Sequence, residues 1–282
     1  MNFDIDKPLL KSLLIIGDVI EARDTYTGGH VWRVSQYAKL LGKQIGLSQD
    51  DITRVSIGGY LHDLGKVGIS DSILRKKSGL DGNEFDTLKT HPTIGGKLIE
   101  AHPLAELALD VILHHHEQLD GKGYPFGLDG DSISLFPRLI AVADAFDAMT
   151  STRPYRKGLP VEEAMKRLDE SSGSHFDPNA VTAIKELDRK GQLTHIISHS
   201  DEGIPLIPCT TCDAIIIVTR ETKDGDLTNC RTCTAEHRLH QRGDTFDAEF
   251  TGNMGKPEDV QPQPDLGMIQ NLVEQTPKRI KL

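Results

Sequence analysis

Histidine and aspartate residues gather in the first half of the chain at positions that could bind metal ions. Seven of the 12 histidines lie between His30 and His116. Imidazole and carboxylate groups together suit iron, manganese or zinc. Several such groups on successive elements of one region favour a metal site over scattered structural histidines. Five separated positions offer this chemistry: His30, the His62-Asp63 pair, His91, the run His114-His115-His116, and Asp144.

Some of these side chains fall on apolar faces, where a polar group needs a partner. On a helix that begins at Leu104, with about 100° per residue, His115 lies at the centre of the apolar stripe. His114 and His116 lie at its two edges, and the periodicity does not choose between them. Asp144 lies in PRLIAVADAFDAMT, which is apolar on nearly every side. Because a buried carboxylate needs a cation or a metal, this segment also favours a metal site.

The four cysteines form a second candidate metal site. They are spaced C-x₂-C-x₁₇-C-x₂-C, within the range of four-cysteine zinc sites. Two tight turns each supply two thiolates to a tetrahedral ion, which leaves no open position for catalysis. Disulfides are the alternative, and His237 and His240 are competing ligands. The predicted ligands of one structural zinc are Cys209, Cys212, Cys230 and Cys233.

The elements that must position these groups are predicted to be mainly helices, from about residue 9 to 195. Apolar residues recur every three or four positions over 31–45 and 104–112, as on amphipathic helices. Glycine, aspartate and proline predict a loop over 120–137, and a second break precedes the β-rich run Ile215–Val218. The predicted fold class is mostly α, with a small C-terminal β-rich zinc ribbon and a disordered tail.

We predict three parts along the chain: a helical domain at 1–195, a zinc-ribbon-like module at 205–240 and a mostly disordered tail at 241–282. The tail is polar and contains proline, as in QPQPD. One amphipathic piece within it could dock on another part of the chain. Its apolar residues are Leu266, Ile269, Leu272 and Val273.

The overall charge and the N-terminal residues disfavour some classes of partner. The formal net charge is −10 at pH 7, whereas a protein that binds long nucleic acid needs a basic surface. A small anionic ligand is compatible with this charge, since a few cations can invert its sign locally. The N-terminal apolar run is too short to cross a bilayer and is interrupted by Lys7 and Lys11. We therefore expect no membrane span and a cytoplasmic location, where cysteines are usually reduced.

These segments resemble the HD-GYP domain, a subgroup of the HD superfamily of metal-dependent phosphohydrolases. The superfamily is named for a His-Asp pair, and Gly123-Tyr124-Pro125 matches the run that names the subgroup. An HD dipeptide alone is weak evidence, whereas six motifs in the family's order are specific. The resemblance covers residues from about 10 to 190 and implies an HD-type helical bundle. The motifs are ARDTYTGGH, HDLGK, HPTIGG, HHEQLDGKGYP, RLIAVADAFDAMTSTRPYR and SGSHFDP.

The resemblance implies a centre of two divalent metal ions, of iron or manganese. The implied ligands of one ion are His30, the His62-Asp63 pair and Asp144, and those of the second are His91, His115 and His116, with Asp63 bridging. The family's two histidines directly before Glu117 select His116 over His114. Where the family has a glutamate that goes with a third metal, this chain has Tyr26, so we expect two ions.

The implied activity is hydrolysis of the cyclic dinucleotide cyclic di-GMP. The product would be pGpG, with or without further cleavage to GMP, and the nucleophile a hydroxide that bridges the two metals. Asp63 and Lys66 are the expected catalytic residues. The arginines of TSTRPYRK suit phosphates and bases through their planar donors. The expected substrate-binding residues are Lys66, Tyr124, Arg153, Arg156 and Lys157.

Other functions fit the same motifs. A related cyclic dinucleotide, such as cyclic GMP-AMP, is one alternative substrate, and the nucleotides of other HD phosphohydrolases are another. The non-enzymatic alternative is a signalling adaptor that recruits protein partners through the GYP loop or the cysteine module. A degenerate adaptor should have lost ligands. Every matched ligand position is filled here, which favours an enzyme.

Overall fold

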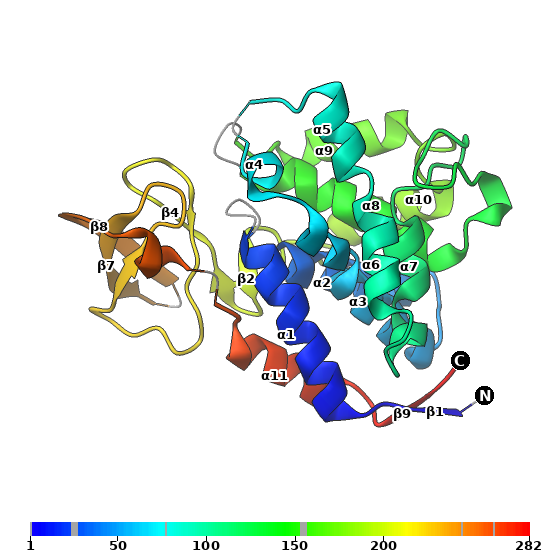
Figure 1. The fold of residues 1–282 in the computed structure, drawn as a ribbon, viewed down its shortest axis with the longest axis horizontal. Coiled ribbons are helices and arrows are strands. Elements are labelled where there is room, and N and C mark those ends of the chain that lie inside the picture. Colours follow the sequence, from blue (N-terminus) through cyan, green and yellow to red (C-terminus); the bar gives the residue numbers. More distant parts are fainter. Residues whose placement is uncertain (1, 24–27, 77, 153–156, 244, 262) are drawn as a thin grey trace.

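Helices dominate the chain up to Arg189 and short strands follow, which confirms the predicted fold class (Figure 1). The structure is a computed structural model that describes residues 2–23, 28–76, 78–152, 157–243, 245–261 and 263–282. Within these ranges no helix has both the length and the apolarity that a bilayer crossing requires. The helices before residue 190 are α1 (Lys7–Arg23), α2 (His30–Gln44), α3 (Gln49–Leu61), α4 (Asp71–Leu74), α5 (Gly82–Leu88), α6 (His91–Ile99), α7 (Leu109–His114), α8 (Leu135–Thr150), α9 (Val161–Glu170) and α10 (Pro178–Arg189), with 3₁₀ turns η1 (Leu64–Gly68), η2 (Ala105–Leu107) and η3 (Gly130–Ser132).

The core of the helical body lies where α2, α3 and α8 pack together. The apolar stripe predicted over 31–45 is buried on α2, where Val34 and Leu41 have no exposed surface. On α8, Phe146 meets Tyr37 edge to face, with ring centroids 5.2 Å apart. Burial of each such side chain contributes about 1.5–3 kcal/mol. The three helices therefore form a well-packed scaffold for the histidine and aspartate side chains that they position.

The helix expected from Leu104 is shorter than predicted. Turn η2 ends at Leu107, and Ala108 leaves helical geometry with φ −141° before α7 begins. The predicted apolar face is still buried, with Val111 and Ile112 in the core. His115 and His116 therefore follow the last turn of α7 instead of lying within a long helix.

A close contact between η1 and α6 brings the first turn of α6 toward Asp63. Gly65 of η1 lies directly against α6, and a Cβ at this position would overlap the carbonyl oxygen of His91. A larger residue would push the two elements apart. The glycine of HDLGK thus sets how near His91 lies to Asp63.

Short strands form a lobe that carries the cysteines, beside the helical body (Figure 1, yellow to orange). Its larger sheet has the antiparallel order β6-β7-β8, and β4 pairs with β5 in a second sheet. Ile207, Ile216 and Leu239 belong to its small core. The strands are β1 (Asn2–Asp4), β2 (His199–Asp201), β3 (Ile204–Pro205), β4 (Ile207–Pro208), β5 (Ile215–Ile216), β6 (Leu227–Asn229), β7 (Ala235–Arg242), β8 (Thr245–Met254) and β9 (Arg279–Lys281); turn η4 (Pro257–Val260) and helix α11 (Leu266–Gln275) lie between the last two strands.

The described residues after 241 form regular elements, which corrects the prediction of a mostly disordered tail. β8 pairs with β7, with Ala248 opposite Leu239, and β9 pairs with β1. Helix α11 returns along α1, where Ile269 and Val273 are buried and Leu266 stays exposed (Figure 1). The predicted docking of this amphipathic piece is therefore confirmed. β9 and α11 contact segments that are distant in sequence, so local polarity did not reveal these contacts. The division at 195, 205 and 241 stays a prediction.

Candidate metal centre

The seven predicted ligands of the helical region lie together in two groups. Within each group, the candidate ligand atoms lie within 4.8 Å of one another. Most of these residues stand at helix ends: His30 begins α2, His91 begins α6, and Asp63 lies between α3 and η1. The two groups are His30, His62 and Asp144, and Asp63, His91, His115 and His116.

His116, and not His114, faces the cluster. The His116 ring lies with its centroid 4.1 Å from that of His115 and 5.1 Å from that of His91. His114 points away, and its Nδ1 lies 2.8 Å from an oxygen of Asp110 on the same helix. The structure thus brings His116, which the family pattern selects, to the cluster and leaves His114 outside it.

Asp63 lies between the two groups. Its Oδ2 is 3.3 Å from Nε2 of His62 and 3.8 Å from Nε2 of His30. Its Oδ1 is 3.4 Å from Nε2 of His91, in the other group. One carboxylate oxygen therefore faces each group, which is the arrangement that a bridging ligand requires.

The hydrogen bonds of the histidine rings fit a divalent cation. Nδ1 atoms of His62, His91 and His115 each donate to a backbone carbonyl of the preceding turn, at 2.7, 2.8 and 3.0 Å. A neutral ring held in this way turns the lone pair of Nε2 toward the cluster. Nε2 of His91 and His115 are 3.2 Å apart, and the buried Nε2 of His62 makes no hydrogen bond within the described residues. Buried acceptors gathered in this way need a shared cation.

Burial and nearby carboxylates shift the pKa values of these groups in different directions. Burial opposes a charge on His62, but the carboxylates, chiefly Asp63, outweigh it and raise the pKa of His62 to about 9. Burial lowers the pKa of His91 to about 4 and the pKa of His116 to about 3. Burial also opposes the charge of Asp63, but Lys66 and His62 hold the pKa of Asp63 well below its usual range. A metal would therefore meet neutral rings at His91 and His116 and an ionised Asp63, and would displace a proton from His62.

Two buried residues that the sequence analysis missed support His30. Nδ1 of His30 donates to Oδ2 of Asp147 at 2.8 Å, and Nε of Arg33 donates to Oδ1 of Asp147 at 2.6 Å. A carboxylate in this position fixes the orientation and tautomer of a ligand histidine. A signal for Asp147 was present, because it lies three residues after Asp144 and so shares its face of α8.

Buried Glu117 anchors the GYP loop over the cluster. Its carboxylate accepts hydrogen bonds from the backbone N–H groups of Phe126 at 2.7 Å and Leu128 at 3.0 Å. The same loop stacks Tyr124 on His116, with ring centroids 4.7 Å apart and an angle of 29° between the planes. In the sequence Glu117 only marks a motif, and its anchoring contact with the loop appears in the structure.

The predicted substrate-binding residues are described only in part. Nζ of Lys66 lies 2.6 Å from Oδ2 of Asp63, and the Lys66 side chain is 20% exposed at the edge of the cluster. Lys157 is exposed. Three residues that the sequence analysis named lie outside the described residues: Tyr26, Arg153 and Arg156.

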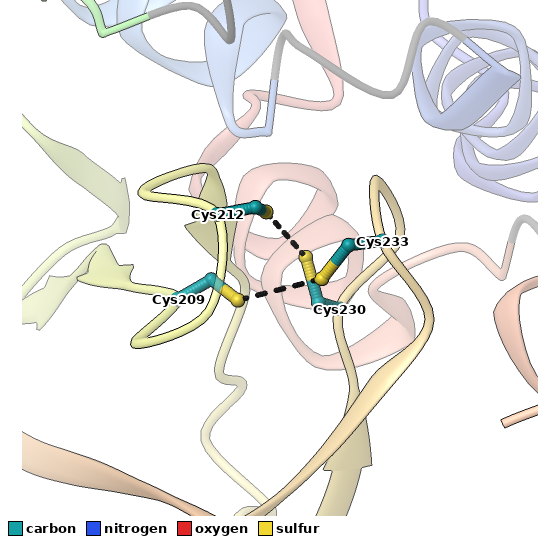
Figure 2. Close-up of side chains that lie close together, drawn as sticks. All are labelled: Cys209, Cys212, Cys230 and Cys233. Atoms are coloured by element: carbon teal, nitrogen blue, oxygen red, sulfur yellow. Dashed lines mark hydrogen bonds between the residues drawn. The ribbon is translucent and has the colours of Figure 1, made fainter. Parts of the chain in front are cut away.

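The four cysteines converge in the second lobe (Figure 2). Their thiols are free, and two Sγ pairs, Cys209 with Cys233 and Cys212 with Cys230, are each 3.7 Å apart. Four sulfurs at about 2.3 Å from a tetrahedral ion would lie about 3.8 Å from one another. The spacing of the thiols therefore fits zinc.

Each cysteine pair lies on the same kind of turn. The N–H of Asp213 donates to the carbonyl of Cys209 at 3.0 Å, and the N–H of Thr234 donates to that of Cys230 at 2.8 Å. Asp213 and Thr234 both have positive φ, 58° and 63°. Two equivalent turns thus point two thiols each into one space. Of the competing ligands, buried His237 lies 3.6 Å from Sγ of Cys209.

Comparison with known proteins places the helical region among HD proteins. Residues 15–180 match the model of a family described as HD domain. A cyclic di-GMP phosphodiesterase of Thermotoga maritima is 37% identical over 184 residues, which are 64% of this chain and 50% of the relative. One of Pseudomonas aeruginosa is 41% identical over 165 residues, 58% of this chain and 40% of the relative. A 3'3'-cGAMP-specific phosphodiesterase of Vibrio cholerae is 37% identical over 171 residues, 60% of this chain and 37% of the relative. The chain thus spans half or less of the length of these relatives.

Two solved structures share the fold. An HDG"Y"P protein from Bdellovibrio bacteriovorus matches with a TM-score of 0.50 and 19% identity, over 58% of this chain and 53% of that chain. A cyclic GMP-AMP-specific phosphodiesterase from V. cholerae matches with a TM-score of 0.50 and 21% identity, over 69% of this chain and 51% of that chain. At these identities the likeness concerns the arrangement of the helices alone.

Proposed function

The chain belongs to the HD domain family, and we propose that it is a phosphodiesterase of the HD-GYP type that hydrolyses cyclic di-GMP to pGpG, with or without a further step to GMP. The observation that carries this proposal is the convergence of six candidate ligand side chains around a seventh, Asp63. The names of the relatives from T. maritima and P. aeruginosa support the substrate.

Two divalent cations, of iron or manganese, are the cofactors that we propose. The residues that would hold them are His30, His62 and Asp144 for one, His91, His115 and His116 for the other, and Asp63 between them. Two bound cations supply positive charge to the phosphoryl oxygens and make a water molecule acidic enough to act as nucleophile near neutral pH. The chain carries a formal charge of −10, so this local positive charge is what an anionic substrate needs.

The remaining polar groups at the cluster orient the substrate and hold charge. Lys66 keeps Asp63 ionised through a contact of 2.6 Å, and its ammonium lies where a phosphate oxygen would approach. Tyr124, stacked on His116, forms one side of the cluster and offers an aromatic face to a base. Lys157, with Arg153 and Arg156 in the same motif, would bind the second phosphate or the guanine bases.

A second cyclic dinucleotide is a candidate substrate. The V. cholerae relative named for 3'3'-cGAMP is 37% identical to this chain, as is the relative from T. maritima named for cyclic di-GMP. Both substrates present the same phosphodiester linkage to the metal centre and differ in one purine. The groups that choose between them must therefore contact the bases.

The cysteine lobe holds one structural zinc in our proposal. The free thiols and their 3.7 Å spacing support this assignment. Unbonded cysteines also suit the reducing cytoplasm as the place of reaction. The lobe and the GYP loop are the surfaces through which signalling protein partners would act.

A substrate panel tests the proposed reaction. Protein purified without oxygen and supplied with manganese or iron(II) is incubated with cyclic di-GMP, cyclic GMP-AMP, pGpG and a simple phosphomonoester, and the products are separated by chromatography. We expect metal-dependent release of pGpG from cyclic di-GMP at the highest rate. Faster hydrolysis of cyclic GMP-AMP would move the assignment to the second substrate, and hydrolysis of the monoester alone would exclude both.

A further inference from the structure

The ring of His30 is held by contacts that reach beyond its own helix. The other rings of the HD cluster with a hydrogen bond at Nδ1 use backbone carbonyls close to them in sequence, as His62 and His91 do. His30 instead relies on the side chain of Asp147, which comes from α8. The position of this ligand therefore depends on what holds Asp147.

Arg33 holds Asp147 through two hydrogen bonds. Nε donates to Oδ1 at 2.6 Å, and Nη2 donates to Oδ2 at 3.0 Å. The guanidinium is 1% exposed, so it needs acceptors for its remaining N–H groups. Nη1 donates to the carbonyls of Gly28 at 2.7 Å and of His199 at 2.9 Å. His199 belongs to β2, which lies outside the HD match of residues 15–180.

Residues of the C-terminal region also contact the turn before His30 closely. Gly29 has φ 74°, and a Cβ there would lie 2.6 Å from Cα of Ser200. A Cβ at Gly28 would lie 2.7 Å from Cδ1 of Ile217, in the cysteine lobe. The two glycines thus leave room for β2 and the lobe to approach α2.

The two contacting segments are joined to each other. Oγ of Ser200 donates to the carbonyl of Val218 at 3.3 Å. Val218 lies in the small apolar core that also contains Cys209. The cysteine lobe, β2 and the turn before α2 therefore form one continuous contact.

We propose that the C-terminal region completes the HD metal site: β2 and Ile217 position His30 through Arg33 and Asp147. The inference rests on the proposed function, because His30 must be a metal ligand for its position to matter. Arg33 is then a positioning residue that lies in the HD region but takes part of its hydrogen bonding from outside it. Loss of a residue that holds a metal ligand in place typically lowers metal affinity by about 10–100-fold.

Manganese titration of the full chain tests this inference, with free manganese(II) followed by electron paramagnetic resonance. Two variants disturb the contact from opposite sides. Arg33→Lys keeps a positive charge near Asp147 but cannot reach both Asp147 and the His199 carbonyl. Ile217→Ala removes the side chain that covers Gly28. Leu227→Ala is the matched control, because Leu227 is 52% exposed on the same lobe.

We expect the wild type and Leu227→Ala to bind two manganese ions. Arg33→Lys and Ile217→Ala should each weaken one of the two sites by about 10-fold or more and leave the other unchanged. A general loss of stability would weaken both sites together, and that result would contradict the inference. Unchanged affinities in both variants would also contradict it, even where the wild type hydrolyses cyclic di-GMP. A different outcome is that both variants lose affinity at one site only, while the wild type hydrolyses no cyclic dinucleotide. That outcome would overturn the proposed function and leave the inferred coupling of the C-terminal region to His30 intact.

Discussion

In four histidines of the HD cluster, a hydrogen bond at Nδ1 leaves Nε2 as the candidate ligand atom. A carbonyl or carboxylate can only accept, so Nδ1 of His62 and of His30 must carry the proton, and Nε2 is left to bind. Neighbouring histidines of the same run can therefore have different roles. His116 faces Asp63 and His91, whereas His114 pairs with Asp110.

The neighbours His116 and His114 provide a matched test at the scale of one side chain. His116→Ala should remove a ligand, lower the manganese stoichiometry and slow cyclic di-GMP hydrolysis by about 100-fold or more. His114→Ala should stay within about twofold of the wild type, because its ring points away from the cluster. Metal analysis and product chromatography on both variants check this prediction. Equal losses in the two variants would show that the assignment of His116 is wrong.

Glu117 offers a second test, because its carboxylate is buried and holds two backbone N–H groups. Glu117→Ala should leave these donors unpaired and lower the free energy of unfolding by about 1–3 kcal/mol for each. Urea unfolding followed by circular dichroism measures the change. Glu106→Ala, at an exposed position of η2, is the control and should have little effect. A stable Glu117→Ala protein would mean that the loop is held by other contacts.

The residues that gather in the HD cluster could be predicted from the sequence, whereas the residues that support them could not. Each ligand lies in a motif of unusual composition, such as HDLGK, and the motifs occur in a characteristic order. Asp147 lies on the same helix face as Asp144, but the sequence does not tell which ring or guanidinium meets it. Nothing in the sequence distinguishes Arg33 from an ordinary polar residue on a helix. Only the packing of α2 against α8 and β2 reveals its contacts.

At the scale of elements, the helices could be placed by periodicity, and the contacts of the C-terminal strands could not. Stripes at 3.6-residue spacing are local, so the position of α2 follows from its own residues. The pairing of β8 with β7 and of β9 with β1 depends on partners that composition does not reveal. The amphipathic pattern of α11 predicted docking but not the surface that receives it, which is α1.

Docking of α11 on α1 should contribute measurably to stability. Ile269 has no exposed surface, so Ile269→Ala should lower the free energy of unfolding by about 2–5 kcal/mol. Leu266 on the same helix is 53% exposed, and Leu266→Ala should change it by less than about 0.5 kcal/mol. Denaturant unfolding of the two variants measures both free energies of unfolding. Similar stabilities would mean that the helix does not pack on the body in solution.

At the scale of the whole molecule, two candidate metal sites of different chemistry lie on two lobes that touch. The HD cluster uses imidazole and carboxylate and keeps a partly exposed side at Asp63 and Lys66. The cysteine site uses four thiolates, and a site of this kind is closed to substrate. We therefore expect the HD metals to serve the reaction and the zinc to serve the fold of the second lobe.

Zinc analysis distinguishes the two sites. A mercurial reagent that reacts with thiols should release one zinc per chain and unfold the cysteine lobe, because so small a core depends on its metal. The absorbance of a zinc indicator records the release, and Cys230→Ser protein, which lacks one thiolate, is the control that should start with little bound zinc. Absence of zinc from native protein would overturn the assignment of this site.

In the proposed mechanism, Asp63 would join two metal ions into one hydrolytic centre, and this role decides the activity. It is tested most directly by the rate of pGpG release from cyclic di-GMP, measured with manganese under anaerobic conditions for the wild type and Asp63→Ala. We predict steady release by the wild type and a rate lower by about 1,000-fold or more in the variant, with its helical content retained. Hydrolysis at the wild-type rate by Asp63→Ala would contradict this account.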